Sequence, residues 1–169
     1  NWTALAFDGD NESDYFDTPR SMNISALVDI ALLVTNIDFG SKNIGDTDDT
    51  DDGSPAPFSL RNNGNVEIEV NITENSTNSL FASQQAPSVY YQFKADNTSG
   101  EPGAFDWENS VTVYTNVPRT PTNTTIFKKF NYTDTIDEAQ IDINITVPPD
   151  ESQGYKESTI EFIGYYQVL

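Results

Sequence analysis

The residues of this sequence best suited to chemistry are the aspartates of one acidic loop. Residues 46–57 read DTDDTDDGSPAP, which places five carboxylates within seven residues and Gly53 directly after them. Calcium takes hard oxygen ligands of this kind, and glycine permits the tight reversal that a calcium-binding loop requires. The alternative interpretation is a solvated run of charge, which is the commoner role of such a block. The candidate metal ligands are Asp46, Asp48, Asp49, Asp51 and Asp52.

The acidic loop does not match the EF-hand pattern. If Asp48 is taken as the first ligand, Asp52 and Gly53 occupy the fifth and sixth positions, but Ser59 stands at the twelfth. An EF-hand requires a bidentate Glu there, and a helix on either side of the loop. We therefore expect any calcium site here to be a looser one between strands, such as a structural ion at a subunit contact.

The sequence offers little else for catalysis. It has no histidine and no cysteine, which excludes imidazole bases, thiolate nucleophiles, disulfides and the commonest zinc ligands. A pair of carboxylates can hydrolyse a glycoside, but nothing distinguishes any two of the many acids for that role. We predict that the protein is not an enzyme and that it requires no cofactor.

The net charge restricts the partners. The chain carries 27 Asp and Glu against 8 Lys and Arg, a formal charge of −19. Such a surface repels nucleic-acid phosphates and anionic lipid headgroups, so nucleic acid is not an expected partner. No segment reaches the ~18 to 20 apolar residues of a membrane span. The start of the chain also has no apolar signal region, so we expect a mature, exported chain.

Nine Asn-x-Ser/Thr sequences indicate N-linked glycans and therefore a secreted, extracellular protein of the cell surface. The 17 Asn and 32 Ser plus Thr residues predict only about three such sequences by chance. The alternative is that a chain rich in Asn and Thr generates them incidentally. The predicted glycosylation sites are Asn1, Asn11, Asn23, Asn71, Asn75, Asn97, Asn123, Asn131 and Asn144.

The elements that position these residues are expected to be strands. Residues 66–73 and 139–147 alternate apolar and polar side chains with a strict two-residue period, which is typical of half-buried strands. The segment Asn62-Asn63-Gly64-Asn65 contains residue types that tolerate positive φ. It therefore predicts a hairpin turn between a strand at residues 57–61 and the strand at residues 66–73.

Further strands complete an all-β domain. They are expected at residues 23–39, 88–93, 110–115, 126–132 and 158–169, with Gly164 as a bulge or a flattening point. A helix is the alternative for residues 25–34, because apolar residues occupy both parities there. Eight to ten short strands without an amphipathic helix predict a single antiparallel β-sandwich of jelly-roll or immunoglobulin-like kind, spanning residues 11–169.

The first ten residues are expected to form an N-terminal extension that carries an extended strand. A polar segment, residues 8–14, separates this strand from the sandwich. A tethered apolar strand can complete the sheet of a neighbouring subunit, and such head-to-tail contacts generate open filaments. The alternative is that the strand folds back onto its own sheet. The candidate donor strand comprises Trp2, Thr3, Ala4, Leu5, Ala6 and Phe7.

Several segments resemble a known group of secreted sandwich domains. Residues 37–40 (IDFG), Gly45-Asp46 and residues 57–66 (PFSLRNNGNV) resemble bacterial biofilm-matrix fibre proteins of the TasA and camelysin kind and archaeal bundling-pilus subunits. Residues 145–151 (ITVPPDE), with Gly154 and Thr159-Ile160, are similar to the closing strands of archaeal surface domains. The resemblance covers residues 24–73 and 139–163, and it implies a jelly-roll subunit that polymerises through its N-terminal strand. The acidic loop departs from this pattern.

Two functions of different classes follow from these observations. The first is a structural subunit of an extracellular filament, pilus or fimbria, a homopolymer assembled by N-terminal donor-strand complementation. The second is a cell-surface adhesion or carbohydrate-binding module that takes calcium and sugar. Its aromatic platform would draw on Trp2, Tyr90, Tyr91, Trp107, Tyr165 and Tyr166, although alternating aromatics in strands more often belong to the core.

Overall fold

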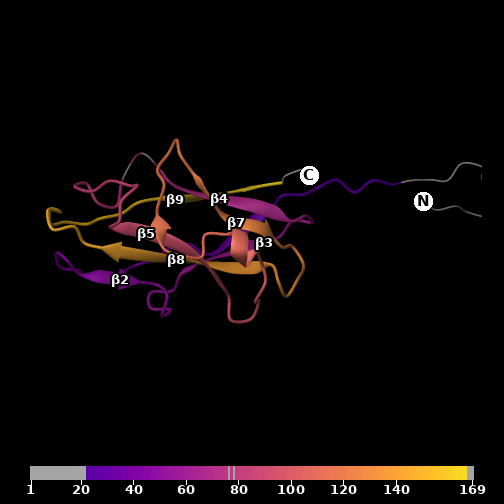
Figure 1. The fold of residues 1–169 in the computed structure, drawn as a ribbon, viewed down its shortest axis with the longest axis horizontal. Coiled ribbons are helices and arrows are strands. Elements are labelled where there is room, and N and C mark those ends of the chain that lie inside the picture. Colours follow the sequence, from indigo (N-terminus) through magenta and orange to yellow (C-terminus); the bar gives the residue numbers. More distant parts are fainter. Residues whose placement is uncertain (1–21, 76, 78, 167–169) are drawn as a thin grey trace, which may run out of the picture.

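The computed structural model describes residues 22–75, 77 and 79–166, so the candidate donor strand at residues 2–7 lies outside the described part. The described residues form nine strands and one short 3-10 turn, which confirms the all-β prediction (Figure 1). The elements are β1 (Ile30–Val34), β2 (Thr47–Asp49), β3 (Phe58–Asn62), β4 (Ile68–Glu74), β5 (Tyr91–Asn97), η1 (Trp107–Asn109), β6 (Thr115–Asn116), β7 (Thr124–Phe130), β8 (Glu138–Thr146) and β9 (Ile160–Tyr165).

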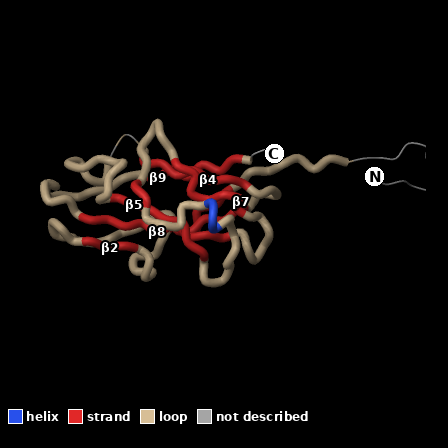
Figure 2. Tube along the Cα trace, in the orientation of Figure 1, coloured by secondary structure: helices blue, strands red, loops and turns tan. Residues whose placement is uncertain are grey.

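The strands form two antiparallel sheets that pack face to face as a β-sandwich (Figure 2). The larger sheet has the order β1-β3-β8-β5-β6, and the smaller sheet has the order β7-β4-β9. The short strand β2 pairs with the end of β8, where Thr47 lies opposite Thr146. β3 pairs with the beginning of β8, where Phe58 lies opposite Ile141. β2 and β3 therefore share one flank of β8.

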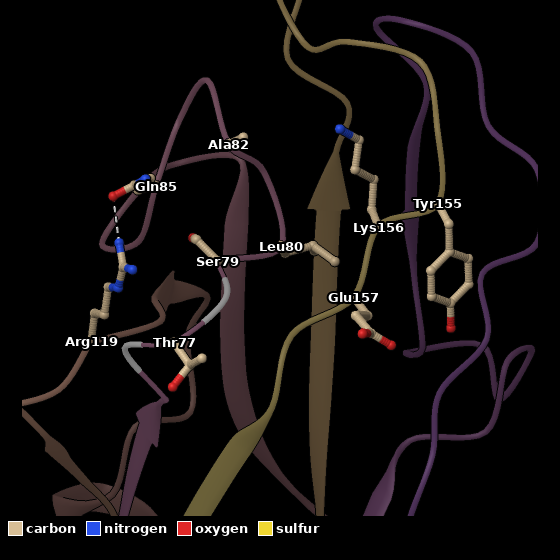
Figure 3. A pocket seen from close by; sticks show the side chains of 9 residues that line it. All are labelled: Thr77, Ser79, Leu80, Ala82, Gln85, Arg119, Tyr155, Lys156 and Glu157. Carbon is tan, nitrogen blue, oxygen red and sulfur yellow. Dashed lines mark hydrogen bonds between the residues drawn. The ribbon is translucent and has the colours of Figure 1, made fainter.

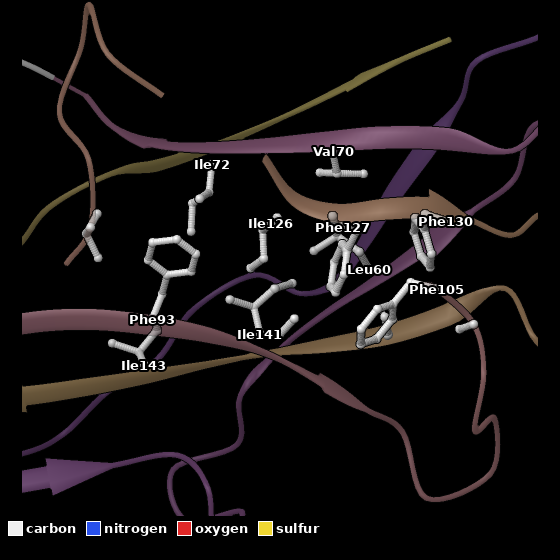
Figure 4. Close-up of a cluster of buried hydrophobic side chains, with 14 of the residues drawn as sticks. Leu60, Val70, Ile72, Phe93, Phe105, Ile126, Phe127, Phe130, Ile141 and Ile143 are labelled. Atoms are coloured by element: carbon white, nitrogen blue, oxygen red, sulfur yellow. The ribbon is translucent and has the colours of Figure 1, made fainter. Parts of the chain in front are cut away.

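The apolar core lies between the two sheets (Figure 4). On β4, the residues Ile68, Val70 and Ile72 are almost fully buried, as their alternation predicted. Ile141 and Ile143 of β8 approach them from the larger sheet. Aromatic side chains fill one end of the core, since the rings of Phe105, Phe127 and Phe130 lie 4.8 and 5.1 Å apart in succession.

The predicted hairpin between β3 and β4 is wrong. β3 pairs with β1 and β8 in the larger sheet, whereas β4 pairs with β7 and β9 in the smaller one. A type I′ hairpin turn requires positive φ at its central residues, and neither Asn63 nor Gly64 has it. The Asn62 side chain instead donates to the carbonyl oxygens of Val66 and Phe130, both at 3.0 Å. These bonds direct the chain from one sheet to the other.

Other predicted strands are shorter than expected. The strand predicted at residues 110–115 is reduced to β6, and the long strand predicted at residues 23–39 is reduced to β1. The helix alternative for residues 25–34 is excluded, because residues 30–34 pair with β3. Within the described residues, no helix has the length and apolar character needed to cross a membrane.

Candidate assembly surface

The structure does not gather the five predicted calcium ligands into one site. Among the described residues, only Asp51 of the five lies within ligand distance of two other acidic groups. The other four have local partners: Asn43 donates to Asp46, Lys42 pairs with Asp48, the Asp51 N–H donates to Asp49, and the Ser54 N–H donates to Asp52. The calcium site of the loop stays a prediction, and its ligands would have to leave these partners.

Asp51 belongs to a cluster that is neutralised in part by a lysine. The carboxylates of Asp51, Asp96 and Asp142 all lie within 4.8 Å of one another. The Lys94 ammonium pairs with Asp51 and lies 3.5 Å from Asp96 and 3.7 Å from Asp142. Burial raises the pKa of Asp142, although the Thr50 hydroxyl donates to it at 2.9 Å. Lys94 thus supplies the positive charge among these carboxylates and ties the acidic loop to the larger sheet.

A second acidic cluster lies at the beginning of β8. It comprises the carboxylates of Glu101, Asp137 and Glu138, which all lie within 4.8 Å of one another. Arg61 of β3 pairs with Glu138. One oxygen of Glu101 accepts the backbone N–H groups of Asp137 at 2.7 Å and Glu138 at 2.8 Å. Burial, and then the Glu101 charge, raise the pKa of Asp137. These contacts attach the loop before η1 to β8, so they have a structural role.

The described glycosylation sites lie at the surface to different degrees. Asn23 and Asn123 are exposed, while the others are half-buried: Asn71, Asn75, Asn97, Asn131 and Asn144. Asn71 on β4 donates to Asn123 at 3.1 Å and accepts from the Thr125 hydroxyl at 2.8 Å. Asn1 and Asn11 lie outside the described residues. Glycosylation stays a prediction at all nine sites.

The predicted aromatic platform is divided among separate environments. Tyr91 is buried, and its hydroxyl shares a hydrogen bond with Ser158 at 3.0 Å. Tyr165 donates to Glu69 at 2.6 Å, and Trp107 stacks on Phe105 with their ring centroids 5.8 Å apart. These three aromatic residues thus contact different partners, Trp2 lies outside the described residues, and sugar binding stays a prediction.

A pocket of about 420 Å³ lies near the start of β9 (Figure 3). It is lined by Thr77, Ser79, Leu80, Ala82, Gln85, Arg119, Tyr155, Lys156 and Glu157. The buried carboxylate of Glu74 holds one wall, because it accepts from the Ser79 hydroxyl at 3.1 Å and from the Leu80 N–H at 3.0 Å. Arg119 donates to Gln85 within the same wall.

A second buried acid, Glu151, holds the opposite wall of this pocket. It pairs with Lys156 and accepts from the N–H and the hydroxyl of Ser83, at 3.0 and 2.7 Å. Desolvation acts to raise the pKa of Glu151, but these hydrogen bonds and the ammonium charge lower it to about 2. Neither Glu74 nor Glu151 stands out in the sequence, because their partners depend on how the loops fold.

The edges of the two sheets differ in how they are covered. The outer edge of β7 is covered, because the Val111 N–H donates to Ile126 at 3.1 Å and the Lys128 carbonyl accepts from Asp106 at 2.9 Å. β1 and β9 also end their sheets. In the part of the chain that the structure describes, no other segment makes backbone hydrogen bonds along the outer edges of these two strands.

β1 and β9 lie on the same side of the sandwich, which we call the open side. A Cβ on Gly164 of β9 would lie 3.2 Å from the Ile30 side chain of β1. Gly164 pairs with Val70 in a continuous register, so it permits close packing and forms no bulge. None of the residues of β1 and β9 is fully buried, and Leu32 and Ile163 are 38% and 48% exposed.

An extended segment, residues 22–29, leads from the start of β1 away from the sandwich (Figure 1); we call it the arm. Its apolar side chains are unusually exposed: Met22 is 76% and Ile24 is 77% accessible. The arm leaves the domain near the end of β9, because the side chains of Val28 and Ile30 lie beside Gly164. An apolar segment in this position is suited to contact with another molecule.

The turn before β4 fixes the base of the arm. The Asn65 side chain accepts from the Leu27 N–H at 2.7 Å and donates to the Ser25 carbonyl at 3.0 Å. The backbone N–H groups of Asn65 and Asn63 donate to Leu27 and Asp29. Asn65 thus pairs with the arm much as a neighbouring strand would.

Residues 22–75, 77 and 79–166 thus present two strand edges that none of these residues pairs with on one side of the sandwich, and an apolar arm at one end. Comparison of the sequence with protein-family models finds no match, and comparison with curated proteins finds none either.

Proposed function

We propose that the protein is the structural subunit of an extracellular filament, in which residues 2–7 of one copy pair with the open side of the next. The observation that carries this proposal is the open side itself. Within the described residues, β1 and β9 have unpaired outer edges, and their apolar side chains are only partly covered. Free edges of this kind promote pairing with another chain unless something covers them. A strand of the next copy would cover them with main-chain hydrogen bonds.

The composition of residues 2–7 suits this role. Apolar residues occupy both parities of the segment WTALAF, as expected for a strand that is buried on both faces. The side chains of one parity would face the core beside Leu32 and Phe162, and those of the other parity would lie on the outer face of the sheet. The charge of −19 per copy opposes association, so apolar burial and backbone pairing must outweigh that repulsion.

The position of the arm supports a head-to-tail arrangement. The arm leaves at the end of β9, beside Gly164, whereas the open side runs along the length of β9. Because the arm and the open side are different surfaces, a copy can give its arm to one neighbour and accept a strand from another, and heterologous contacts that do not close generate open filaments. The nine glycosylation sequences support an extracellular location on the cell surface for this filament.

Deletion of residues 1–10 tests this proposal. The truncated chain is expected to keep the circular dichroism spectrum and the unfolding midpoint of the full chain, because the described sandwich contains none of the deleted residues. Electron microscopy should show filaments for the full chain and single particles for the truncated one. A peptide of residues 1–10 should bind the truncated chain, and a control peptide with Leu5→Asp should not. Filaments formed by the truncated chain, or single particles of the full chain at high concentration, contradict the proposal.

A further inference from the structure

We propose that the pocket near the start of β9 receives residues 14–17 (DYFD) of the neighbouring copy that supplies the donor strand. This inference rests on the proposed filament, and it adds a second, charged contact to the strand pairing. It commits to one occupant, a second copy of this chain, and it also gives the direction in which the donor strand runs.

The pocket and the arm lie at opposite ends of β9. Tyr155, Lys156 and Glu157 line the pocket and precede β9, which begins at Ile160. At the other end of β9, Gly164 packs against the base of the arm. When copies join head to tail, the arm of one copy therefore points toward the pocket end of the next.

The order of segments along the chain matches the order of surfaces on the neighbour. Going back along the chain from the arm, residues 14–17 come first and residues 2–7 follow. On the next copy, the pocket is met first and the free edge of β9 follows. The six residues between the two segments span at most about 20 Å, which is ample to pass from the pocket to the start of β9. The donor strand then runs antiparallel to β9.

The chemistry of the pocket complements residues 14–17. The chain has only 8 basic residues against 27 acidic ones, yet Arg119 and Lys156 lie on opposite sides of this pocket (Figure 3). The segment DYFD places an acidic residue on either side of two aromatic ones. Its aspartates fit the two cations, and its rings fit the Leu80 side chain and the Tyr155 ring, which is 88% exposed.

Basic residues are more frequent around this pocket than in the chain as a whole. Arg119 and Lys156 are two of the five charged residues that line or support it, the others being Glu74, Glu151 and Glu157, whereas the whole chain has 8 basic residues against 27 acidic ones. Lys156 is held in place by Glu151, and Arg119 is held by Gln85. Both cations are therefore positioned before a ligand arrives, which lowers the entropy lost on binding.

A charge reversal with a compensating reversal tests the pocket. Arg119→Glu is expected to raise the protein concentration needed for filament growth about tenfold. A single reversal, Asp14→Lys or Asp17→Lys, introduced into the Arg119→Glu chain, should restore most of the loss in the variant whose new lysine faces Glu at position 119, because the other aspartate still faces Lys156. Lys129→Glu is the matched control, because it changes the net charge equally and its side chain on β7 is 70% exposed. Unfolding midpoints should verify that all variants fold.

A labelled peptide of residues 11–20 gives a second readout that does not require filaments. It should bind the full-length monomer saturably and bind the Arg119→Glu variant at least about tenfold more weakly. The pocket inference is overturned if the Arg119→Glu variant assembles and binds the peptide as well as the Lys129→Glu control does. The filament proposal still stands in that case, provided that deletion of residues 1–10 abolishes filaments. If the full chain forms no filaments, the filament proposal fails, and with it the inference.

Discussion

Gly64→Ala is expected to loosen the base of the arm. A Cβ on Gly64 would lie 2.4 Å from the Leu27 carbonyl oxygen and 2.9 Å from the Asn62 side-chain oxygen. Because the Leu27 oxygen belongs to the backbone, the arm itself must retreat by at least 0.6 Å to restore a distance of 3.0 Å. The bond from the Asn65 N–H to Leu27 is already 3.2 Å long and would break. The bond from the Leu27 N–H to Asn65 would be strained with it.

The magnitude follows from these two hydrogen bonds. Each contributes about 1 kcal/mol, so their loss lowers the free energy of unfolding by about 2 kcal/mol. Gly64 does not have positive φ, so alanine adds no backbone strain and its smaller unfolded-state entropy returns about 0.4–1 kcal/mol. Gly100→Ala is the matched control, since its Cβ would meet nothing within 4 Å. The two variants should differ by about 2 kcal/mol, or about 4–8 °C in Tm for a chain of this size.

Urea unfolding followed by circular dichroism measures this difference directly. Hydrogen exchange at the Leu27 amide should also accelerate in Gly64→Ala and remain unchanged in Gly100→Ala. Equal stabilities within about 0.5 kcal/mol, together with unchanged exchange at Leu27, would refute the conclusion that the turn holds the arm.

Three further predictions concern the sandwich. The pKa of Glu151 is lowered to about 2, so its contribution to stability is present above its ordinary pKa and is lost as the pH falls toward 2. Glu151→Gln should therefore be less stable than the wild type at pH 7 and should lack this part of the stability loss in acid. Urea unfolding from pH 7 to pH 2 measures both effects. Lys94→Met leaves three aspartates without their ammonium, one of them buried, and should cost about 2 kcal/mol in the same assay. Phe127→Ala opens a cavity in the core and should cost about 3–5 kcal/mol.

Each of these variants has a control and a contradicting result. An acid profile of Glu151→Gln that parallels the wild type would contradict the pKa argument. Lys42→Met removes a more exposed ion pair and should lower the free energy of unfolding by no more than about 1 kcal/mol. An equal loss in Lys94→Met would show that the Asp51 cluster stabilises the fold no more than this surface ion pair does. Val113→Ala alters an exposed side chain and is expected to be neutral within about 0.5 kcal/mol, whereas Phe127→Ala is not.

Strand positions could be predicted where one face of a strand is buried. The alternation in residues 66–73 and 139–147 locates β4 and β8 to within about two residues, because burial of every second side chain is a local property of the sequence. Strand partners are not local. Asn62-Asn63-Gly64-Asn65 has the composition of a hairpin turn, but the backbone there has no positive φ and joins two sheets.

Side-chain partners were the least predictable feature. The alternation in residues 139–147 places Asp142 at a polar, solvent-facing position, yet Asp142 is buried because Thr50 and Lys94 arrive from other parts of the chain. The pocket depends in the same way on Glu74 and Glu151, which are two of 27 acidic residues and carry no distinguishing pattern. The free edge of β9 also escapes sequence analysis, because an edge is defined by the absence of a neighbour.

The connection between the arm and β1 has a mechanical consequence. The arm continues directly into β1, which pairs antiparallel with β3 from Ile30 to Val34. Tension applied along the arm therefore acts parallel to the strand and perpendicular to its hydrogen bonds. Such a load is shared by the whole ladder at once, whereas a load across the strand would open it one bond at a time. In a filament pulled from its ends, β1 would act as an anchor that resists shear.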